Sequence, residues 1–131
     1  MIMARLLNFP SSLADKTVAS LLMDDAFTER FVSTNRARLS ESYQHVAQFL
    51  KTHGIPYHQS NAGLFAWVNL RAAKHQEITD GEILDRLRAE KVYLTSVSTY
   101  ASEEDGWFRI VIAHPRHVLG EGLKRILRAI A

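Results

Sequence analysis

Apolar positions repeat with helical spacing in four parts of the chain. The repeat predicts a helix over about residues 12–23 and, after a short break, a long helix over about residues 26–53. A third helix is predicted over about residues 79–90, because Thr79 and the glutamate three positions later have the form of a capping box. A fourth is predicted over about residues 118–130, where leucine and isoleucine fall on one side.

Four shorter segments have the composition of strands: residues 55–58, 63–70, 91–95 and 107–114. The second is almost continuously apolar, so both of its faces are expected to be covered, with Phe65 and Trp67 in the core. This order of elements predicts an α+β fold: a small, mostly antiparallel sheet of three to four strands packed with helices and preceded by the long helix. We expect a single domain over residues 1–131, with residues 1–10 as a connector or helix stub.

Composition narrows the class of protein. A chain of 131 residues is long enough for one domain with a core. The formal net charge of +2 is small and spread along the chain, so no nucleic acid is expected as a partner. No apolar run approaches the roughly 20 residues that span a bilayer, so no membrane is expected. The chain has no cysteine, which excludes disulfides and thiolate chemistry and fits a cytoplasmic protein.

One arginine lies inside an otherwise apolar run. In a regular strand Arg109 shares a face with Trp107 and Val111. Burying a guanidinium costs free energy unless acceptors meet it, and its planar fork of donors suits a carboxylate. From the residues alone, Arg109 is either a rim residue with a packed stem and a solvated head, or the anchor of an acidic small molecule.

Other candidate groups are weaker. Ser96 opens a hydroxyl-rich loop that could donate to a ligand or serve as a solvated connector, and the connector is the simpler interpretation. Asn61 either faces a pocket or makes a turn, and its neighbours favour the turn. His114 and His117 are close in sequence, but no third ligand accompanies them, so no metal site is expected. Every lysine sits in a polar or amphipathic setting, which does not predict a covalent role.

Several segments, taken in order, resemble one family. Residues 61–70 (NAGLFAWVNL) resemble a segment of the class I/II pyridoxal-phosphate aminotransferases, closest to the branch containing 1-aminocyclopropane-1-carboxylate synthases. Residues 106–110 (GWFRI) are similar to the strand of that branch which carries the substrate-carboxylate arginine. Residues 11–27 are similar to the helix after the cofactor lysine, and residues 35–39 (NRARL) also match. The likeness covers nearly the whole chain.

The resemblance implies the C-terminal small domain of a fold-type I enzyme, with Arg109 gripping the substrate α-carboxylate. Asn61 and Ser96 are further candidate substrate-binding residues. The family's cofactor lysine and phosphate contacts lie upstream of the matched region, so the catalytic residues stay unknown. Pyridoxal phosphate is implied by the family only and is not expected to bind this chain alone. The chain is therefore not expected to transaminate alone.

The resemblance also implies partners. They are a small amino or keto acid and a large domain or partner chain, as in a biosynthetic enzyme of which this is a truncated part. Without that large domain, an exposed apolar patch and self-association are expected. Two alternatives stay open. One is a stand-alone relic domain that binds a small acidic molecule and has a cofactor-free activity. The other is a structural or interaction module.

Overall fold

The computed structural model describes residues 11–74, 78–96 and 104–131. The expected connector at residues 1–10 and most of the hydroxyl-rich loop lie outside these ranges. Contacts divide the chain into two compact units, Met1–Arg38 and Leu39–Ala131. The assignment of residues 1–131 to a single domain stays a prediction, and the units are described separately.

The first unit is helical, as the sequence predicts. Helix α2 spans Ser12–Leu22 and helix α3 begins at Asp25 and runs to Thr52. The break between them falls where Asp24 accepts a hydrogen bond from the backbone N–H of Phe27 at 2.9 Å, which caps α3. The apolar residues of α2 are exposed, and none of its side chains is buried.

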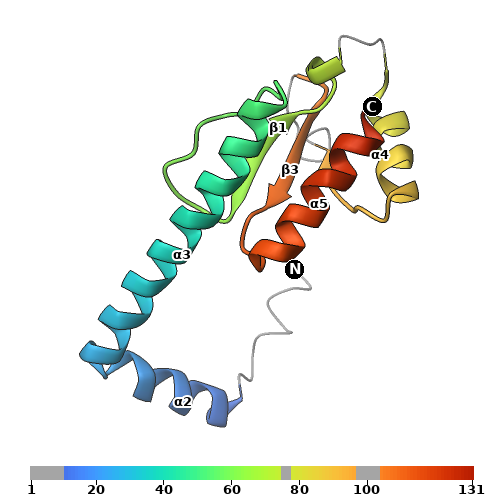
Figure 1. Ribbon diagram of the computed structural model, residues 1–131. Coiled ribbons are helices and arrows are strands. Elements are labelled where there is room, and N and C mark those ends of the chain that lie inside the picture. The colour runs from blue at the N-terminus through green and yellow to red at the C-terminus, as the bar shows by residue number, and fades with distance from the viewer. Residues whose placement is uncertain (1–10, 75–77, 97–103) are drawn as a thin grey trace. The chain divides into compact units, whose positions relative to one another are not determined.

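The second unit is α+β, and the predicted fold class is confirmed. Strand β1 (Phe65–Asn69) pairs with β3 (Trp107–Val111), which pairs with the short β2 (Thr95–Ser96), and both pairings are antiparallel. Figure 1 shows helix α5 (Arg116–Ala129) lying along the sheet, with helix α4 (Asp80–Ala89) beside α5. A short 3₁₀ turn, η1 (Ala72–Lys74), follows β1.

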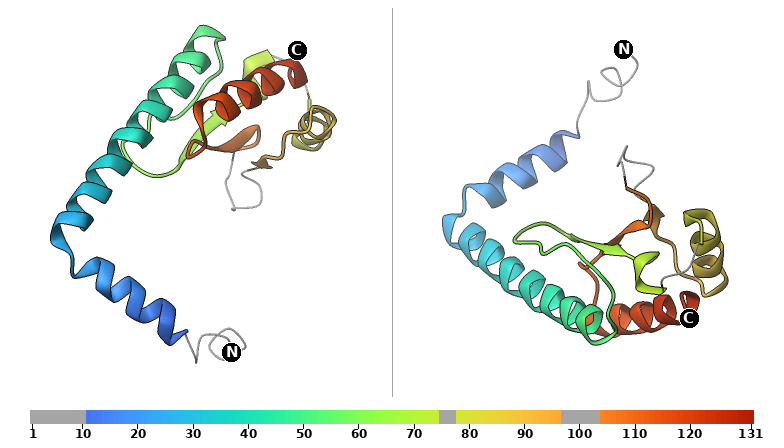
Figure 2. Two further views of the ribbon diagram at one scale, coloured as in Figure 1. Left: turned by 60° about the horizontal axis from the view of Figure 1, so that its bottom comes forward. Right: turned by 90° about the horizontal axis from the view of Figure 1, so that it is seen from above.

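The core of this unit lies between one face of the sheet and the helices, as both views of Figure 2 show. The C-terminal part of α3 contributes Val46 and Leu50, which are buried. The sheet contributes the even-numbered residues of β1 and β3, including Val68 and Phe108, each fully buried. The expectation that Phe65 and Trp67 belong to the core is wrong. Both are half-buried and alternate with the core residues, because the described helices cover one face only.

Two predicted strands are shorter than the sequence suggests. Residues 55–58 form only an isolated bridge from Tyr57 to Val68. Residues 91–94 are not in a strand, because Lys91 closes helix α4 with a left-handed φ of 59°. Its N–H donates to the carbonyl of Arg88, and that of Val92 donates to the carbonyl of Leu87, which is the Schellman pattern.

Helix α3 ends with the same hydrogen-bond pattern, but with a glycine in the left-handed position. The two helix ends can therefore be compared by substitution. Gly54 has φ 64°, and a Cβ built there would meet nothing within 4 Å. We expect Lys91→Gly to raise the free energy of unfolding by about 1 kcal/mol, since glycine adopts this conformation without strain. Gly54→Ala should lower it by a similar amount. Urea unfolding followed by circular dichroism measures both, and equal effects of the same sign would contradict this account.

Candidate functional site

Arg109 occupies the centre of the sheet. In the register it lies opposite Trp67 of β1 and opposite Thr95 of β2. Its side chain is half-buried and lies on the face that alternates with the core residues Phe108 and Ile110. The sequence-based placement of Arg109 on the same face as its neighbours two positions away is therefore confirmed.

The Arg109 guanidinium stacks on an aromatic ring. Its Cζ lies 4.3 Å from the centroid of the Phe65 ring, which is a cation–π contact worth about 0.5–2 kcal/mol. A guanidinium presents its N–H donors as a planar fork, which suits a carboxylate held by two parallel hydrogen bonds.

More aromatic side chains lie on the same face of the sheet. The rings of His58 and Trp107 stack with centroids 4.1 Å apart and an interplanar angle of 14°. The indole Nε1 of Trp107 donates to a carboxylate oxygen of Glu104 at 3.0 Å. Phe65, Trp67 and Trp107 thus place three aromatic side chains on the face of the sheet that carries Arg109.

The two other candidate residues lie on either side of this strand. Asn61 is exposed in the run of bends that leads into β1, so the interpretation of Asn61 as a turn residue agrees with its place. Ser96 lies in β2 opposite Phe108, one position beyond the pair of Thr95 with Arg109. Residues 97–99 of the same loop lie outside the described ranges. Participation of Asn61 and Ser96 in substrate binding stays a prediction.

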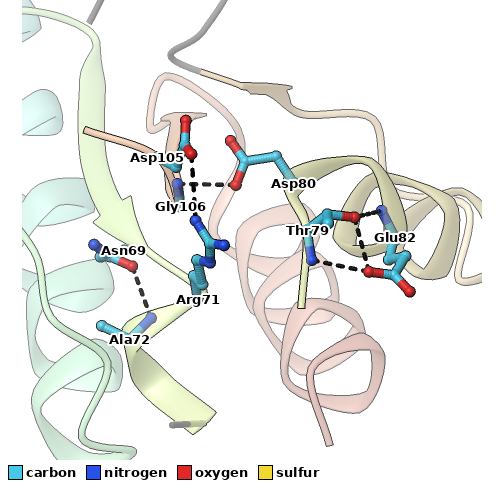
Figure 3. Close-up of polar contacts among 8 residues, drawn as sticks. All are labelled: Asn69, Arg71, Ala72, Thr79, Asp80, Glu82, Asp105 and Gly106. Carbon is cyan, nitrogen blue, oxygen red and sulfur yellow. Dashed lines mark hydrogen bonds and ion pairs between the residues drawn. The ribbon is translucent and has the colours of Figure 1, made fainter. Parts of the chain in front are cut away.

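A polar cluster fixes the start of β3, as Figure 3 shows. The N–H of Gly106 donates to Oδ1 of Asp80 at 2.9 Å, which ties β3 to the first turn of α4. Arg71, after β1, pairs with Asp105 at 3.4 Å. Asn69 Oδ1 accepts from the N–H of Ala72 at 2.8 Å. These bonds join the ends of β1, α4 and β3 three residues before Arg109.

The predicted capping box of α4 lies at the edge of this cluster and is confirmed. Thr79 accepts from the N–H of Glu82, and a Glu82 carboxylate oxygen accepts from the N–H of Thr79 at 2.9 Å. The backbone hydrogen bond from Thr79 lowers the pKa of Glu82 below its ordinary value of 4.5. The cap is therefore intact near neutral pH and weakens only on acidification below about 4.5, as Glu82 gains a proton.

Sequence reasoning missed two residues that position the arginine. Phe65 was expected in the core but instead stacks on Arg109, and Asp80 was considered only as part of a capping sequence. Only the strand register could reveal the first, because Phe65 and Arg109 are 44 positions apart (109 − 65 = 44) and diagonal across the β1–β3 pair. Within the described ranges, no three histidine, aspartate or glutamate side chains gather as a candidate metal site. No described helix is both long enough and apolar enough to cross a membrane.

Comparison with known proteins gives the family. The family model for aminotransferase class I and II matches residues 1–126 of this chain. The chain therefore belongs to this family. Its relatives place it in the 1-aminocyclopropane-1-carboxylate synthase-like branch. 1-Aminocyclopropane-1-carboxylate synthase 4 from Oryza sativa subsp. japonica is 37% identical over 127 residues, which cover 90% of this chain and 26% of that protein. The 1-aminocyclopropane-1-carboxylate synthase-like protein 1 of Bos taurus is 32% identical over 123 residues, 92% of this chain and 24% of that protein.

Solved structures agree on the fold. An aromatic aminotransferase from Pyrococcus horikoshii OT3 superposes with a TM-score of 0.72 at 20% identity, over 84% of this chain and 28% of that one. The PLP-bound C-S lyase from Staphylococcus hominis gives a TM-score of 0.66 at 21% identity, over 79% of this chain and 28% of that one. The chain thus spans about a quarter of the length of the relatives it matches.

The cofactor that the family implies requires a lysine as its covalent anchor. Four lysines have described side chains, and all four are exposed: Lys16, Lys51, Lys91 and Lys124. A lysine that holds pyridoxal phosphate covalently requires an apolar pocket or a neighbouring cation to keep its amine unprotonated near neutral pH. None of the four lysines with described side chains therefore has the buried setting that a covalent bond to the cofactor requires.

Proposed function

We propose that this chain is the small-domain part of a pyridoxal-phosphate-dependent aminotransferase-like enzyme, in which Arg109 binds the α-carboxylate of an amino or keto acid. The observation that carries the proposal is the Arg109–Phe65 stack, 4.3 Å from Cζ to ring centroid, on the face of the sheet opposite its core. The contact places the guanidinium carbon over the Phe65 ring. Family membership supplies the reaction class.

The carboxylate contact is tested by binding. We expect Arg109→Ala to weaken binding of 2-oxoglutarate and L-phenylalanine by at least about tenfold, because a charge-assisted pair of hydrogen bonds is lost. Arg109→Lys should also bind more weakly, since an ammonium cannot form the planar two-bond contact. Titration calorimetry measures both. The half-buried, non-core position of Arg109 predicts that both variants fold. Unchanged affinity for both acids would remove Arg109 from the site.

Chemistry requires groups beyond those described in this chain. Pyridoxal phosphate would supply the electron sink for bond breaking at the α-carbon, and the covalent lysine belongs to a large domain or partner chain. The chain alone should therefore form no lasting lysine adduct with pyridoxal phosphate. Mass spectrometry after borohydride reduction, with free amines present as competitors, tests this. An adduct at one lysine that persists in the presence of these amines would contradict the assignment of the covalent lysine to a large domain or partner chain.

The exposed apolar residues of the first unit support a covering partner. Leu13 and Met23 of the α2 region are 77% and 84% exposed, and Phe31 of α3 is 60% exposed. Surfaces of this kind mark interaction sites in soluble proteins. In the proposed assembly the large domain or partner chain covers them, and the chain alone self-associates through them. This feature also supports the second candidate function, an interaction module, which would retain pairing but no carboxylate dependence on Arg109.

A further inference from the structure

A groove unrelated to the family assignment lies along the outer edge of the sheet in the second unit. It has a volume of about 600 Å³ and runs between helix α5, strand β3 and residues 91–95. Its floor is apolar, with Leu94, Ile110, Leu119, Leu123 and Ile126 among the lining residues. Both the volume and the apolar lining lie within the range of small-molecule sites.

The strand register explains why the groove is open. The N–H of Ile112 donates to the carbonyl of Leu64 on the β1 side at 2.9 Å. Because bonding directions alternate along an antiparallel strand, the backbone of Val111 faces the opposite edge. Strand β2 begins only at Thr95, opposite Arg109. The left-handed turn at Lys91 comes before it, and residues 91–94 are not part of a strand. On the β2 side of β3, therefore, no strand in the described ranges pairs with Val111, whose partner in β1 is Phe65.

Basic side chains surround this apolar floor, including Arg109 of β3. Lys91 and Arg125 line one end, where Arg125 also contacts the carbonyl of Glu90 at 3.5 Å. His114 and His117 line the other end, where α5 begins. Glu121 is the single carboxylate among the lining residues, and its charge is already matched by Arg125 at 2.8 Å and Arg128 at 3.9 Å.

The beginning of α5 adds to this positive character. Its N-cap is Pro115, which makes no side-chain capping hydrogen bond. The first N–H groups of a helix have no acceptor within the helix and carry a partial positive charge. An occupant of this groove thus meets an apolar floor along its length and positive groups at the rim. A molecule with one apolar part and one anionic end complements both.

We propose that the groove binds a small apolar carboxylic acid, with its tail along the floor formed by α5 and β3 and its carboxylate at the histidine end. This site is additional to the substrate-carboxylate contact proposed for Arg109. Arg109 contributes to both places, because its Cζ lies over the Phe65 ring and the residue also lines the groove from β3. The groove extends from there to α5, where Val118 and Gly122 line it, so substitutions on α5 alter the groove without changing Arg109.

Gly122 provides a way to fill the groove. It lines the groove from α5, and a Cβ built there would meet nothing within 4 Å. A leucine at this position would extend into the open space without a clash at its Cβ. Gly120, two positions earlier, is a control on the same helix, because it does not line the groove and a Cβ there would lie 3.9 Å from Nε2 of His45.

The experiment is a titration of the ¹⁵N-labelled chain with octanoate, followed by amide chemical shifts. Octanoate should shift the amides of Val118 and Gly122, and 1-octanol, with the same tail, should bind about tenfold more weakly. Gly122→Leu should weaken octanoate binding about tenfold or more. Val118→Glu should do the same by repelling the carboxylate, and as a substitution at an exposed position it should leave the fold intact. Gly120→Ala should bind as the unmodified chain does.

Three results would overturn the proposal: octanoate affinity unaffected by both groove variants, equal affinity for 1-octanol, or shifts at Val118 that depend on protein concentration and resist octanoate. The last would assign the groove to a second copy of the chain. Two variants separate the two proposals, because Gly122 lines the groove from α5 whereas Arg109 lines the groove and carries the proposed carboxylate contact. If Gly122→Leu and Val118→Glu leave octanoate binding unchanged while Arg109→Ala weakens 2-oxoglutarate binding, the groove proposal fails and the proposed function stands. If both groove variants weaken octanoate binding but Arg109→Ala leaves 2-oxoglutarate affinity unchanged, the proposed function fails alone.

Discussion

Phe108→Ala should lower the free energy of unfolding by about 3–5 kcal/mol. Phe108 has no exposed surface and lies in the central strand β3, so truncation leaves a cavity between the sheet and the helices. Domains of this size are typically stable by about 5–15 kcal/mol in total, so the loss is a large fraction of the whole. Urea unfolding monitored by the fluorescence of Trp67 and Trp107 measures it.

A control for this prediction lies three residues along the same strand. Val111 is 39% exposed, so Val111→Ala removes less buried surface and should cost well under about 1.5 kcal/mol. Both variants shorten a side chain without changing the charge. If Val111→Ala destabilised the chain as much as Phe108→Ala, the core would not lie on the even-numbered face of the sheet.

The contrast between these residues shows what the sequence could and could not establish. Helical spacing, with the capping box for α4, predicted the four α-helices of the described ranges to within a few residues, because the apolar stripes repeat over several turns. The strands were harder. A run such as residues 63–70 is apolar on both faces, so periodicity could not tell which face meets the helices. The pattern therefore placed Phe65 and Trp67 in the core, whereas Ala66 and Val68 are the buried residues.

The candidate site was predicted in part for a related reason. A charged residue within an apolar strand is visible in the sequence, and Arg109 was found in that way. Its partner Phe65 is set by strand register, which depends on how β1 and β3 pair. The groove beside α5 had no sequence signal, because it results from the shortness of β2, which in the described ranges does not extend as far as Val111. Lys91 sets the path of the chain before β2 by adopting a left-handed conformation. A glycine at this position would have indicated such a turn in the sequence, whereas a lysine does not.

Gly106→Ala should be the most damaging small substitution near the site. Gly106 has φ 86°, and a Cβ there would lie 2.5 Å from Cβ of Arg71 and 2.9 Å from Oδ1 of Asn69. Strain in the left-handed region costs about 1–2 kcal/mol, and the overlap adds to it. We expect a total loss of more than about 2 kcal/mol in the free energy of unfolding, measured by urea denaturation.

Gly63 separates the two causes. Its φ of 92° is nearly the same, but a Cβ there would meet nothing within 4 Å. Gly63→Ala therefore carries the backbone strain without the overlap, and the difference between the two variants measures the overlap. Arg71→Gly tests this in a second way, since removing the Arg71 Cβ should reduce the penalty of Gly106→Ala. If Gly63→Ala lowered the free energy of unfolding as much as Gly106→Ala, the overlap with Arg71 and Asn69 would have no effect.

The same substitution connects the fold to the proposed function. The N–H of Gly106 donates to Asp80, and its carbonyl accepts from the N–H of Leu70 at 3.0 Å, so one residue joins β1, α4 and β3. Displacing it moves the start of the strand that carries Arg109 over Phe65. We therefore expect Gly106→Ala, under conditions where it is still folded, to weaken 2-oxoglutarate binding while leaving octanoate binding at the α5 groove nearly unchanged. Equal weakening of both ligands would mean that the substitution loosens the whole unit rather than the arginine.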